Sequence, residues 1–229
     1  MKNMKKTKVF NTASICIGVI NIIAAVFAVS HLPEKVPTHF DINGVCDGFG
    51  SRWGLMFVAV IPLILSFIFL LTARLIKNQQ PKLLSLTGFL FSLFFASYFW
   101  LLYPLASSDI QIGDKLENQP FSVALPLVFA VLFVILGNYT PLIAPNKALG
   151  LRVKWTLENP QCWKATHRFM GKIMVVSGLL TAAISIISYA FMGTGFIFGF
   201  VLTMIMLTVI ITIPTVFAYI HRNDRLSAE

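Results

Sequence analysis

Residues 137–172 concentrate the side chains of this 229-residue chain that could bind a partner or carry out chemistry. The stretch is long, yet it contains tryptophan, asparagine, threonine, histidine and basic residues in place of the flexible residues of a plain linker. Its candidate binding residues are Asn146, Arg152, Lys154, Trp155, Thr156, Trp163, His167 and Arg168. Arginine and lysine donate hydrogen bonds to acidic groups, and tryptophan offers a large, rigid contact surface. We therefore predict a folded polar surface here that binds a protein or another ligand.

A simpler interpretation of the same stretch is an anchor at a membrane interface. Tryptophan is enriched at the level of the lipid headgroups, and basic residues are attracted to anionic lipid.

The stretch also contains a helix start, because Asn159 suits the N-cap position and Pro160 the first helical position. A helix that begins there would continue into the next apolar segment and place Trp163, His167 and Met170 on one face.

A second unusual stretch, residues 31–53, lies between two apolar segments. Asn43-Gly44 is a turn signal and a glycine-rich run follows it, so we expect a short hairpin or compact loop. Its candidate recognition residues are His39, Asp41, Asn43 and Asp47. Together with Cys46 they could be drawn as a metal site, but their spacing matches no known zinc motif, and we predict no metal.

Catalytic motifs are missing from the sequence. There is no HExxH, no G-x-S-x-G, no P-loop and no pair of acids within an apolar segment. A lone histidine is a weak base candidate when no positioned partner is evident. We therefore predict neither an enzyme nor a cofactor. The alternative is an enzyme that acts at the membrane interface, with Asn146, Arg152 and His167 as its candidate residues.

The elements that must position these two stretches are transmembrane helices. Hydrophobic residues make up 57% of the chain and charged residues only 12%, with a mean hydropathy of +0.80. A soluble domain of this size could not bury so much apolar surface. Six segments approach the length of about 20 apolar residues that spans a bilayer. They are residues 9–30, 54–75, 83–106, 121–139, 169–191 and 195–219. We predict an all-α polytopic membrane bundle in which residues 1–229 form a single membrane domain.

The distribution of basic residues predicts the orientation of the bundle. If both termini are cytoplasmic, 15 of the 18 basic residues face the cytoplasm and six of the nine acidic residues face outward. Residues 31–53 then form an outward loop and residues 137–172 a cytoplasmic loop. The net charge of +9 is explained by this asymmetry, so nucleic acid is not needed as a partner. The first apolar segment is longer than that of a typical signal peptide, and we expect it to be retained.

The predicted spans carry no ionisable residue in their central parts. Ionisable residues inside a membrane usually mark proton relays, ion paths or charged substrates, so the sequence argues against these activities. A small carrier or channel for a neutral or amphipathic substrate stays open as an alternative. Gly171 and Gly178 lie on one face of a predicted span, and we expect them to allow close helix packing within the bundle, with dimerisation as the alternative.

Both unusual stretches resemble parts of one known family. The longer stretch resembles the signature of the SdpI family of bacterial membrane proteins. The matching residues are Gly137-Asn138, Pro145-Asn146, Gly150-Leu151-Arg152, Trp155-Thr156-Leu157, Trp163, Thr166-His167-Arg168 and Gly171. The outward loop resembles the domain of unknown function that often precedes this signature. Its matching residues are Leu32-Pro33, Val36-Pro37, His39-Phe40, Asn43-Gly44, Asp47-Gly48 and Gly50.

The resemblance implies a function as well as a fold. It implies a multi-pass protein of the bacterial plasma membrane that confers immunity to a secreted antimicrobial peptide toxin. It also implies a receptor that sequesters a cytoplasmic transcriptional repressor at the membrane. The expected partners are therefore membrane lipid, a toxic peptide outside and a repressor inside, with Arg152, Lys154, Trp163 and Arg168 as the residues to test for the repressor. The resemblance fixes no oligomeric state.

Overall fold

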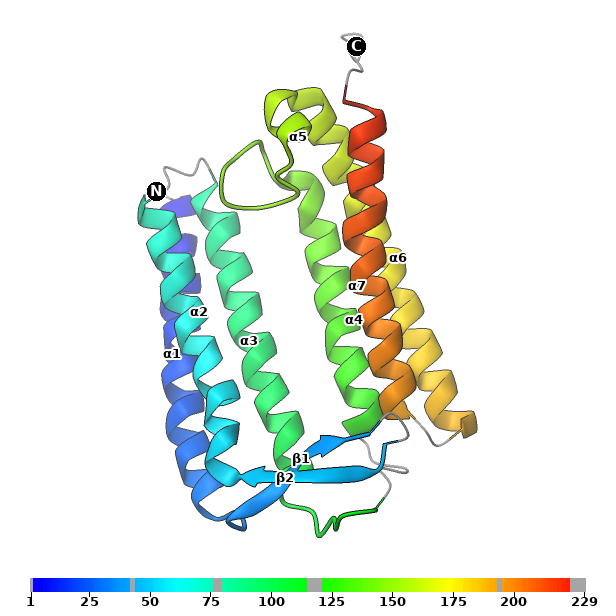
Figure 1. The fold of residues 1–229 in the computed structure, drawn as a ribbon. Coiled ribbons are helices and arrows are strands. Elements are labelled where there is room, and N and C mark those ends of the chain that lie inside the picture. Colours follow the sequence, from blue (N-terminus) through cyan, green and yellow to red (C-terminus); the bar gives the residue numbers. More distant parts are fainter. Residues whose placement is uncertain (1, 42–43, 76–79, 115–120, 193–194, 223–229) are drawn as a thin grey trace.

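The computed structural model describes residues 2–41, 44–75, 80–114, 121–192 and 195–222, and it places six long helices side by side (Figure 1). The six are α1 (Lys2–Ser30), α2 (Met56–Leu75), α3 (Pro81–Ala106), α4 (Phe121–Tyr139), α6 (Pro160–Met192) and α7 (Gly195–Ile220). Each contains a segment long and apolar enough to cross a membrane, so the prediction of six spans is confirmed. The start of α1 and the end of α7 lie at the same end of the molecule.

The helices form two groups of three. Helices α1, α2 and α3 pack together, as do α4, α6 and α7, and α3 contacts α4 between the groups. Short connections make antiparallel neighbours, which accounts for the grouping of α2 with α3 and of α6 with α7. Below, α1–α3 are called the first bundle, and α4, α6 and α7 the second bundle.

Small polar side chains tie the first bundle together inside its apolar packing. The Oγ atom of Ser92 on α3 lies 2.7 Å from Ser14 Oγ on α1 and 3.0 Å from Ser66 Oγ on α2. Two turns further along α1, Asn21 donates to the Ala59 carbonyl oxygen at 2.9 Å and accepts from the Trp100 indole at 3.0 Å. Buried polar groups within a membrane must find partners in the protein, and here each bond also joins two helices.

Glycines set the spacing of the second bundle. A Cβ on Gly171 of α6 would lie 2.6 Å from the Gly137 carbonyl oxygen of α4. A Cβ on Gly178 would lie 2.7 Å from the Ala130 carbonyl oxygen, also of α4. The two helices can approach this closely only because both positions lack a side chain. The prediction that Gly171 and Gly178 serve packing within the bundle is confirmed.

A β-hairpin crosses one end of the molecule, beneath both bundles in Figure 1. Strand β1 (Lys35–Phe40) pairs antiparallel with β2 (Cys46–Ser51), and the 3-10 helix η1 (Arg52–Leu55) leads into α2. The predicted hairpin is confirmed; Asn43, half of the predicted turn, lies outside the described residues. Val36 belongs to the core of the first bundle, whereas Phe40 packs against a cluster that contains Leu125 of α4. The hairpin therefore packs against the first bundle and against the cluster of Leu105 and Leu125, where α3 meets α4.

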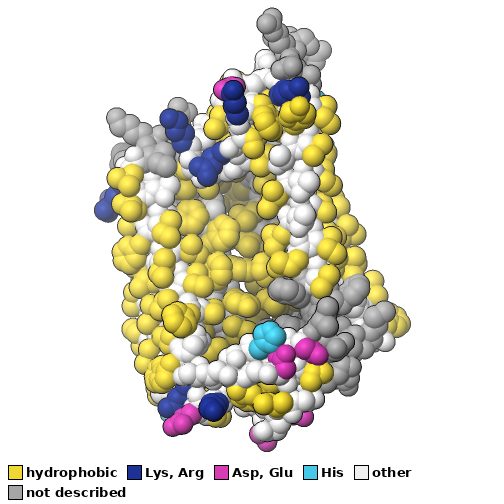
Figure 2. Space-filling view, viewed as in Figure 1, with side chains coloured by type: hydrophobic (Ala, Val, Ile, Leu, Met, Phe, Trp, Pro, Cys, Tyr) yellow, Lys and Arg dark blue, Asp and Glu magenta, His cyan; other side chains and the backbone are white. Residues whose placement is uncertain are grey.

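Charged side chains gather at the two ends of the molecule (Figure 2). The visible face between the ends is almost entirely hydrophobic, as expected of helices whose outer surface contacts lipid tails. Most of the visible acidic side chains lie at the hairpin end, and most of the visible Lys and Arg side chains lie around the opposite end. The loop between α4 and α6 is at this opposite end.

Candidate functional site

The candidate site is the loop of residues 140–159 together with the first turns of α6. It begins with the 3-10 helix η2 (Thr140–Leu142) and ends with the short helix α5 (Lys154–Glu158). We call residues 140–159 the α4–α6 loop. The segment folds back over the start of α6, and its polar side chains bond mainly to its own backbone.

Trp163 and His167 form the centre of the site. They are one turn apart on α6, and their rings stack with centroids 4.1 Å apart and planes 18° from parallel. Trp163 is 1% exposed and His167 is fully buried. The Trp163 indole donates to the Ile143 carbonyl oxygen at 2.7 Å, so the tryptophan also fixes the start of the loop. The prediction that these two side chains share one helix face is confirmed.

Both ring nitrogens of His167 bond to backbone atoms. The Leu151 amide donates to Nε2 at 3.1 Å, which makes Nε2 an acceptor. Nδ1 lies 2.9 Å from the Trp163 carbonyl oxygen and must therefore carry the proton. The imidazole is thus neutral with both nitrogens engaged, and neither is free to take a proton from a substrate. This geometry removes the support for His167 as the base of an interfacial enzyme.

Gly150 allows the loop to close over His167. Its φ angle is +95°, in the left-handed region that favours glycine. A Cβ at this position would also overlap Nε2 of His167. The next residue, Leu151, can then direct its amide at the imidazole. Gly150 is one of the residues that match the family signature, but the sequence alone gives no sign of this contact with His167.

Asn146 fixes the first half of the loop. Its Oδ1 accepts from the amides of Ala148 and Leu149, both at 2.7 Å. Its Nδ2 donates to the carbonyl oxygens of Ala144 at 2.8 Å and Leu149 at 3.3 Å. The side chain thus takes the place of backbone partners in a tight turn, as asparagine often does. Asn146 acts here as a brace of the loop.

Thr156 and Asn159 fix the second half of the loop. Thr156 is fully buried, and its hydroxyl accepts from the Val153 amide at 3.2 Å and lies 2.8 Å from the Leu151 carbonyl oxygen. Asn159 Oδ1 accepts from the amides of Gln161 at 3.0 Å and Cys162 at 3.2 Å. This is the N-cap predicted from Asn159-Pro160, and α6 runs without a break from that cap into the membrane span.

The basic candidates remain on the surface. Arg152, Lys154 and Arg168 are exposed, and within the described ranges none of them forms a salt bridge. Arg152 donates to the Lys147 carbonyl oxygen, which holds its stem against the loop. Trp155 is half-buried with its ring edge-to-face against Tyr219 of α7, 5.4 Å between centroids. The structure therefore separates the predicted residues into buried or half-buried side chains that hold the loop and an exposed basic surface.

Gln80 is a site residue that sequence reasoning missed. It lies at the start of α3, in the first bundle. Its Nε2 donates to the Leu142 carbonyl oxygen at 2.8 Å, and its Oε1 accepts from the Ala144 amide at 2.8 Å. One side chain thus fastens the first bundle to the α4–α6 loop. The two partners are more than 60 residues away in sequence, and no local signal marks the pairing.

The outward candidates lie on the hairpin, far from the α4–α6 loop (Figure 1). His39 on β1 forms a hydrogen-bonded pair with Asp47 on β2, and both side chains are exposed. Asp41 caps the turn, since its Oδ1 accepts from the Val45 amide at 2.8 Å. Across the parts of the chain that the structure describes, no three His, Cys, Asp or Glu side chains are grouped as metal ligands would be.

Comparisons with known proteins connect both regions to one family. The model of the SdpI/YfhL protein family matches residues 143–215, and that of a domain of unknown function, DUF1648, matches residues 16–65. The immunity protein SdpI of Bacillus subtilis is 25% identical over 221 residues, which cover 96% of this chain and 98% of that protein. An uncharacterized protein of Archaeoglobus fulgidus is 26% identical over 122 residues, which cover 46% of this chain and 67% of that protein.

No solved structure matches the chain. The first family match contains most of the α4–α6 loop, all of α6 and most of α7, and the second contains the hairpin. These matches agree with the six helices that are able to cross a membrane. They also agree with the alignment to the Bacillus protein, which covers nearly the whole of both chains. This chain is a multi-pass bacterial membrane protein that is similar to the SdpI/YfhL family over residues 143–215 and to the Bacillus immunity protein over nearly its whole length.

Proposed function

We propose that this chain is an immunity protein that protects a bacterial cell against a secreted antimicrobial peptide. The observation that carries the proposal is the alignment with the Bacillus subtilis immunity protein, which covers 96% of one chain and 98% of the other. The likeness therefore extends over the helices, the hairpin and the α4–α6 loop alike. A resemblance confined to one motif would support only a shared fold element.

We place recognition of the toxic peptide on the exposed face of the hairpin. With both termini in the cytoplasm, the hairpin lies on the outer side, where a secreted peptide arrives first. Arg52 at its base donates to the Ser30 carbonyl oxygen at 3.2 Å and to the Leu32 carbonyl oxygen. These bonds fasten the hairpin to the end of α1, and the exposed pair of His39 and Asp47 offers charged and polar contacts.

We also propose that the α4–α6 loop binds a cytoplasmic repressor through Arg152, Lys154 and Arg168. These side chains are exposed basic groups without salt-bridge partners among the described residues, which suits an acidic surface on the repressor. Trp163 is buried, so its part in binding is to hold the loop that presents the basic groups. For peptide binding outside to change repressor binding inside, the protein must have two states with different contacts at both ends.

Immunity is tested by a killing curve in a Bacillus strain that is sensitive to the toxic peptide of the family. We expect cells that express this chain to survive a higher peptide concentration than cells with an empty vector. We expect a smaller increase in the survived peptide concentration for His39→Ala and for Asp47→Ala. Arg74 is an exposed basic residue at the other end of the molecule, and Arg74→Ala should leave the increase unchanged. No shift at a normal membrane level would contradict the proposal and favour a carrier of a neutral or amphipathic substrate.

Repressor binding is tested separately by co-purification with the repressor in the presence and absence of the peptide. Arg152→Ala and Lys154→Ala should each reduce the amount of repressor retained. Arg74→Ala, which also removes one exposed basic side chain, serves as the control. We expect more repressor to be retained when the peptide is present. Equal amounts with and without peptide would contradict a signalling role while leaving immunity intact.

A further inference from the structure

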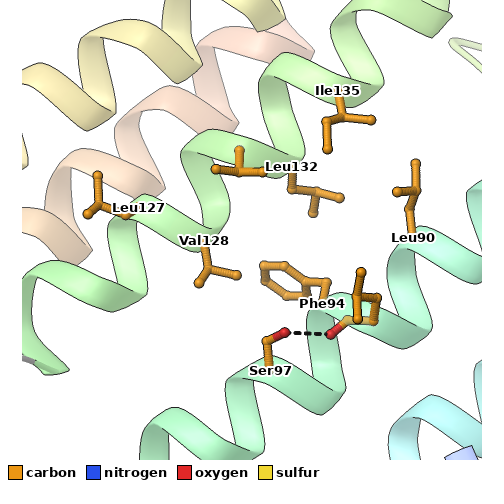
Figure 3. A pocket seen from close by; sticks show the side chains of 9 residues that line it. Leu90, Phe94, Ser97, Leu127, Val128, Leu132 and Ile135 are labelled. Carbon is orange, nitrogen blue, oxygen red and sulfur yellow. Dashed lines mark hydrogen bonds between the residues drawn. The ribbon is translucent and has the colours of Figure 1, made fainter. Parts of the chain in front are cut away.

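An apolar groove follows the contact between the two bundles. Residues of α3 and α4 face each other across a cavity of about 270 Å³, with Leu90, Phe94 and Ser97 on one wall and Val128 and Ile135 among those on the other (Figure 3). The lining is almost entirely hydrocarbon. Both walls belong to helices that can cross a membrane, so the groove lies at the depth of the lipid tails.

The groove continues toward the end of the molecule that carries the α4–α6 loop. A second cavity, of about 380 Å³, is lined by Lys82 and Leu86 of α3 and by Tyr139 of α4. On α3, Leu86 is one turn from Leu90 of the first cavity; on α4, Tyr139 is one turn from Ile135. Residues three or four apart share a helix face, so the two cavities are parts of one groove.

The shape and lining of the groove suit one lipid chain. From Leu86 to Ser97 the helix rises roughly 16 Å, at about 1.5 Å per residue, which is close to half of a hydrocarbon core of about 30 Å. Water is excluded at this depth, and an empty apolar groove would forfeit dispersion contacts on both walls. The bilayer itself supplies acyl chains at high concentration.

The end of the groove suits an anionic headgroup. Lys82 is exposed in the first turn of α3, where the helix dipole also favours negative charge. No acidic side chain lines this cavity, and Lys82 forms no salt bridge within the described residues. Tyr139 beside it is a residue type enriched at the membrane interface.

We propose that the α3–α4 groove binds one anionic phospholipid, with its headgroup at Lys82 and an acyl chain between Leu90 and Ile135. The lipid would fill the seam between the two bundles at the end where Gln80 joins α3 to the α4–α6 loop. This inference does not depend on the immunity function, because it rests on the groove and its charge alone.

The test is native mass spectrometry of the full chain, delipidated in detergent and titrated with phosphatidylglycerol or phosphatidylcholine. We expect one phosphatidylglycerol to bind more tightly than phosphatidylcholine. Lys82→Gln should weaken the binding of phosphatidylglycerol about fivefold, because one lysine near an anionic headgroup contributes about 1 kcal/mol. The affinity for phosphatidylcholine should not change. Lys164→Gln, an exposed basic residue at the same end, is the control and should have no effect.

Bulky substitutions test the acyl-chain half of the proposal. Leu90→Trp and Ile135→Trp fill the groove from opposite walls, and each should abolish the single tight site. Ile187→Trp adds the same bulk on a lipid-facing position of α6 and should leave the site intact. Each variant should unfold at the same temperature as the wild-type protein, which shows that it is correctly folded. Retention of phosphatidylglycerol by both groove variants would overturn the proposal and assign the groove to another apolar occupant, such as a peptide helix.

Discussion

The imidazole of His167 occupies the space that a side chain on Gly150 would need. Gly150 has a φ angle of +95°, and a Cβ built on it would overlap Nε2 of the histidine. The same nitrogen accepts the hydrogen bond of the Leu151 amide. Both the backbone conformation at position 150 and the contact with the imidazole require glycine. The α4–α6 loop can therefore close over α6 only with glycine at this position.

Gly150→Ala should destabilise the protein for two separable reasons. A left-handed alanine costs about 1–2 kcal/mol, and the overlap with a buried ring adds roughly 1–3 kcal/mol. Gly113→Ala is a matched control, because Gly113 has a φ angle of +93° and a Cβ there would meet nothing within 4 Å. Denaturant unfolding in mixed micelles should show the larger loss for Gly150→Ala. An equal loss in the two variants would contradict the contact with His167.

Gln80→Ala should loosen the attachment of the α4–α6 loop to the first bundle. The substitution removes the bonds to the Leu142 carbonyl oxygen and the Ala144 amide, at a cost of about 1 kcal/mol for each. Hydrogen exchange at the Ala144 amide should become faster. Gln80→Glu keeps an acceptor for that amide but faces the Leu142 oxygen with a second acceptor, so Ala144 should stay protected while the contact with Leu142 is lost.

The control for this prediction is Gln111→Ala. Gln111 is an exposed glutamine whose side chain bonds to Asp109 at the hairpin end of the molecule. Exchange at Ala144 should be unchanged in this variant. If Gln80→Ala also leaves the exchange rate at Ala144 unchanged, the side chain of Gln80 does not hold the loop.

Ser92→Ala should weaken the packing of the first bundle. Its hydroxyl lies within hydrogen-bonding distance of Ser14 and Ser66 on the two neighbouring helices. Hydrogen bonds between membrane helices contribute about 0.6 kcal/mol on average, with a maximum near about 1.7 kcal/mol. The expected loss in unfolding free energy lies in this range.

Ser97→Ala is the matched control on the same helix. The Ser97 hydroxyl donates to the Leu93 carbonyl oxygen within α3, so it joins no two helices. Its removal should change the unfolding free energy by much less. Equal losses for the two serines would show that the bonds between helices contribute nothing beyond the bonds within α3.

The parts of the fold that follow from local chemistry could be predicted from the sequence. The spans follow from the length of apolar runs, and the start of α6 follows from Asn159-Pro160, because capping depends on adjacent residues. The shared face of Trp163 and His167 follows from helical periodicity alone. These features need no knowledge of what lies elsewhere in the chain.

The parts that depend on distant contacts could not be predicted in this way. Trp163 was interpreted as part of a binding surface, but the loop folds over its face and leaves it 1% exposed. The bond between Gln80 and Ala144 joins residues 64 positions apart, and a glutamine before a helix-starting proline gives no sign of it. Gly150 could be read from the sequence, but the requirement for glycine at this position depends on where His167 lies.

The orientation of the bundle can be tested with single cysteines. The three native cysteines, Cys16, Cys46 and Cys162, are free thiols and can be replaced to give a background without thiols. Lys154→Cys lies on the α4–α6 loop and Ser107→Cys at the opposite end, and both positions are exposed. A membrane-impermeant maleimide added to intact cells should label Ser107→Cys and leave Lys154→Cys unlabelled until the cells are opened. The reverse pattern would contradict the orientation inferred from the basic residues, and it would move peptide recognition from the hairpin to the α4–α6 loop.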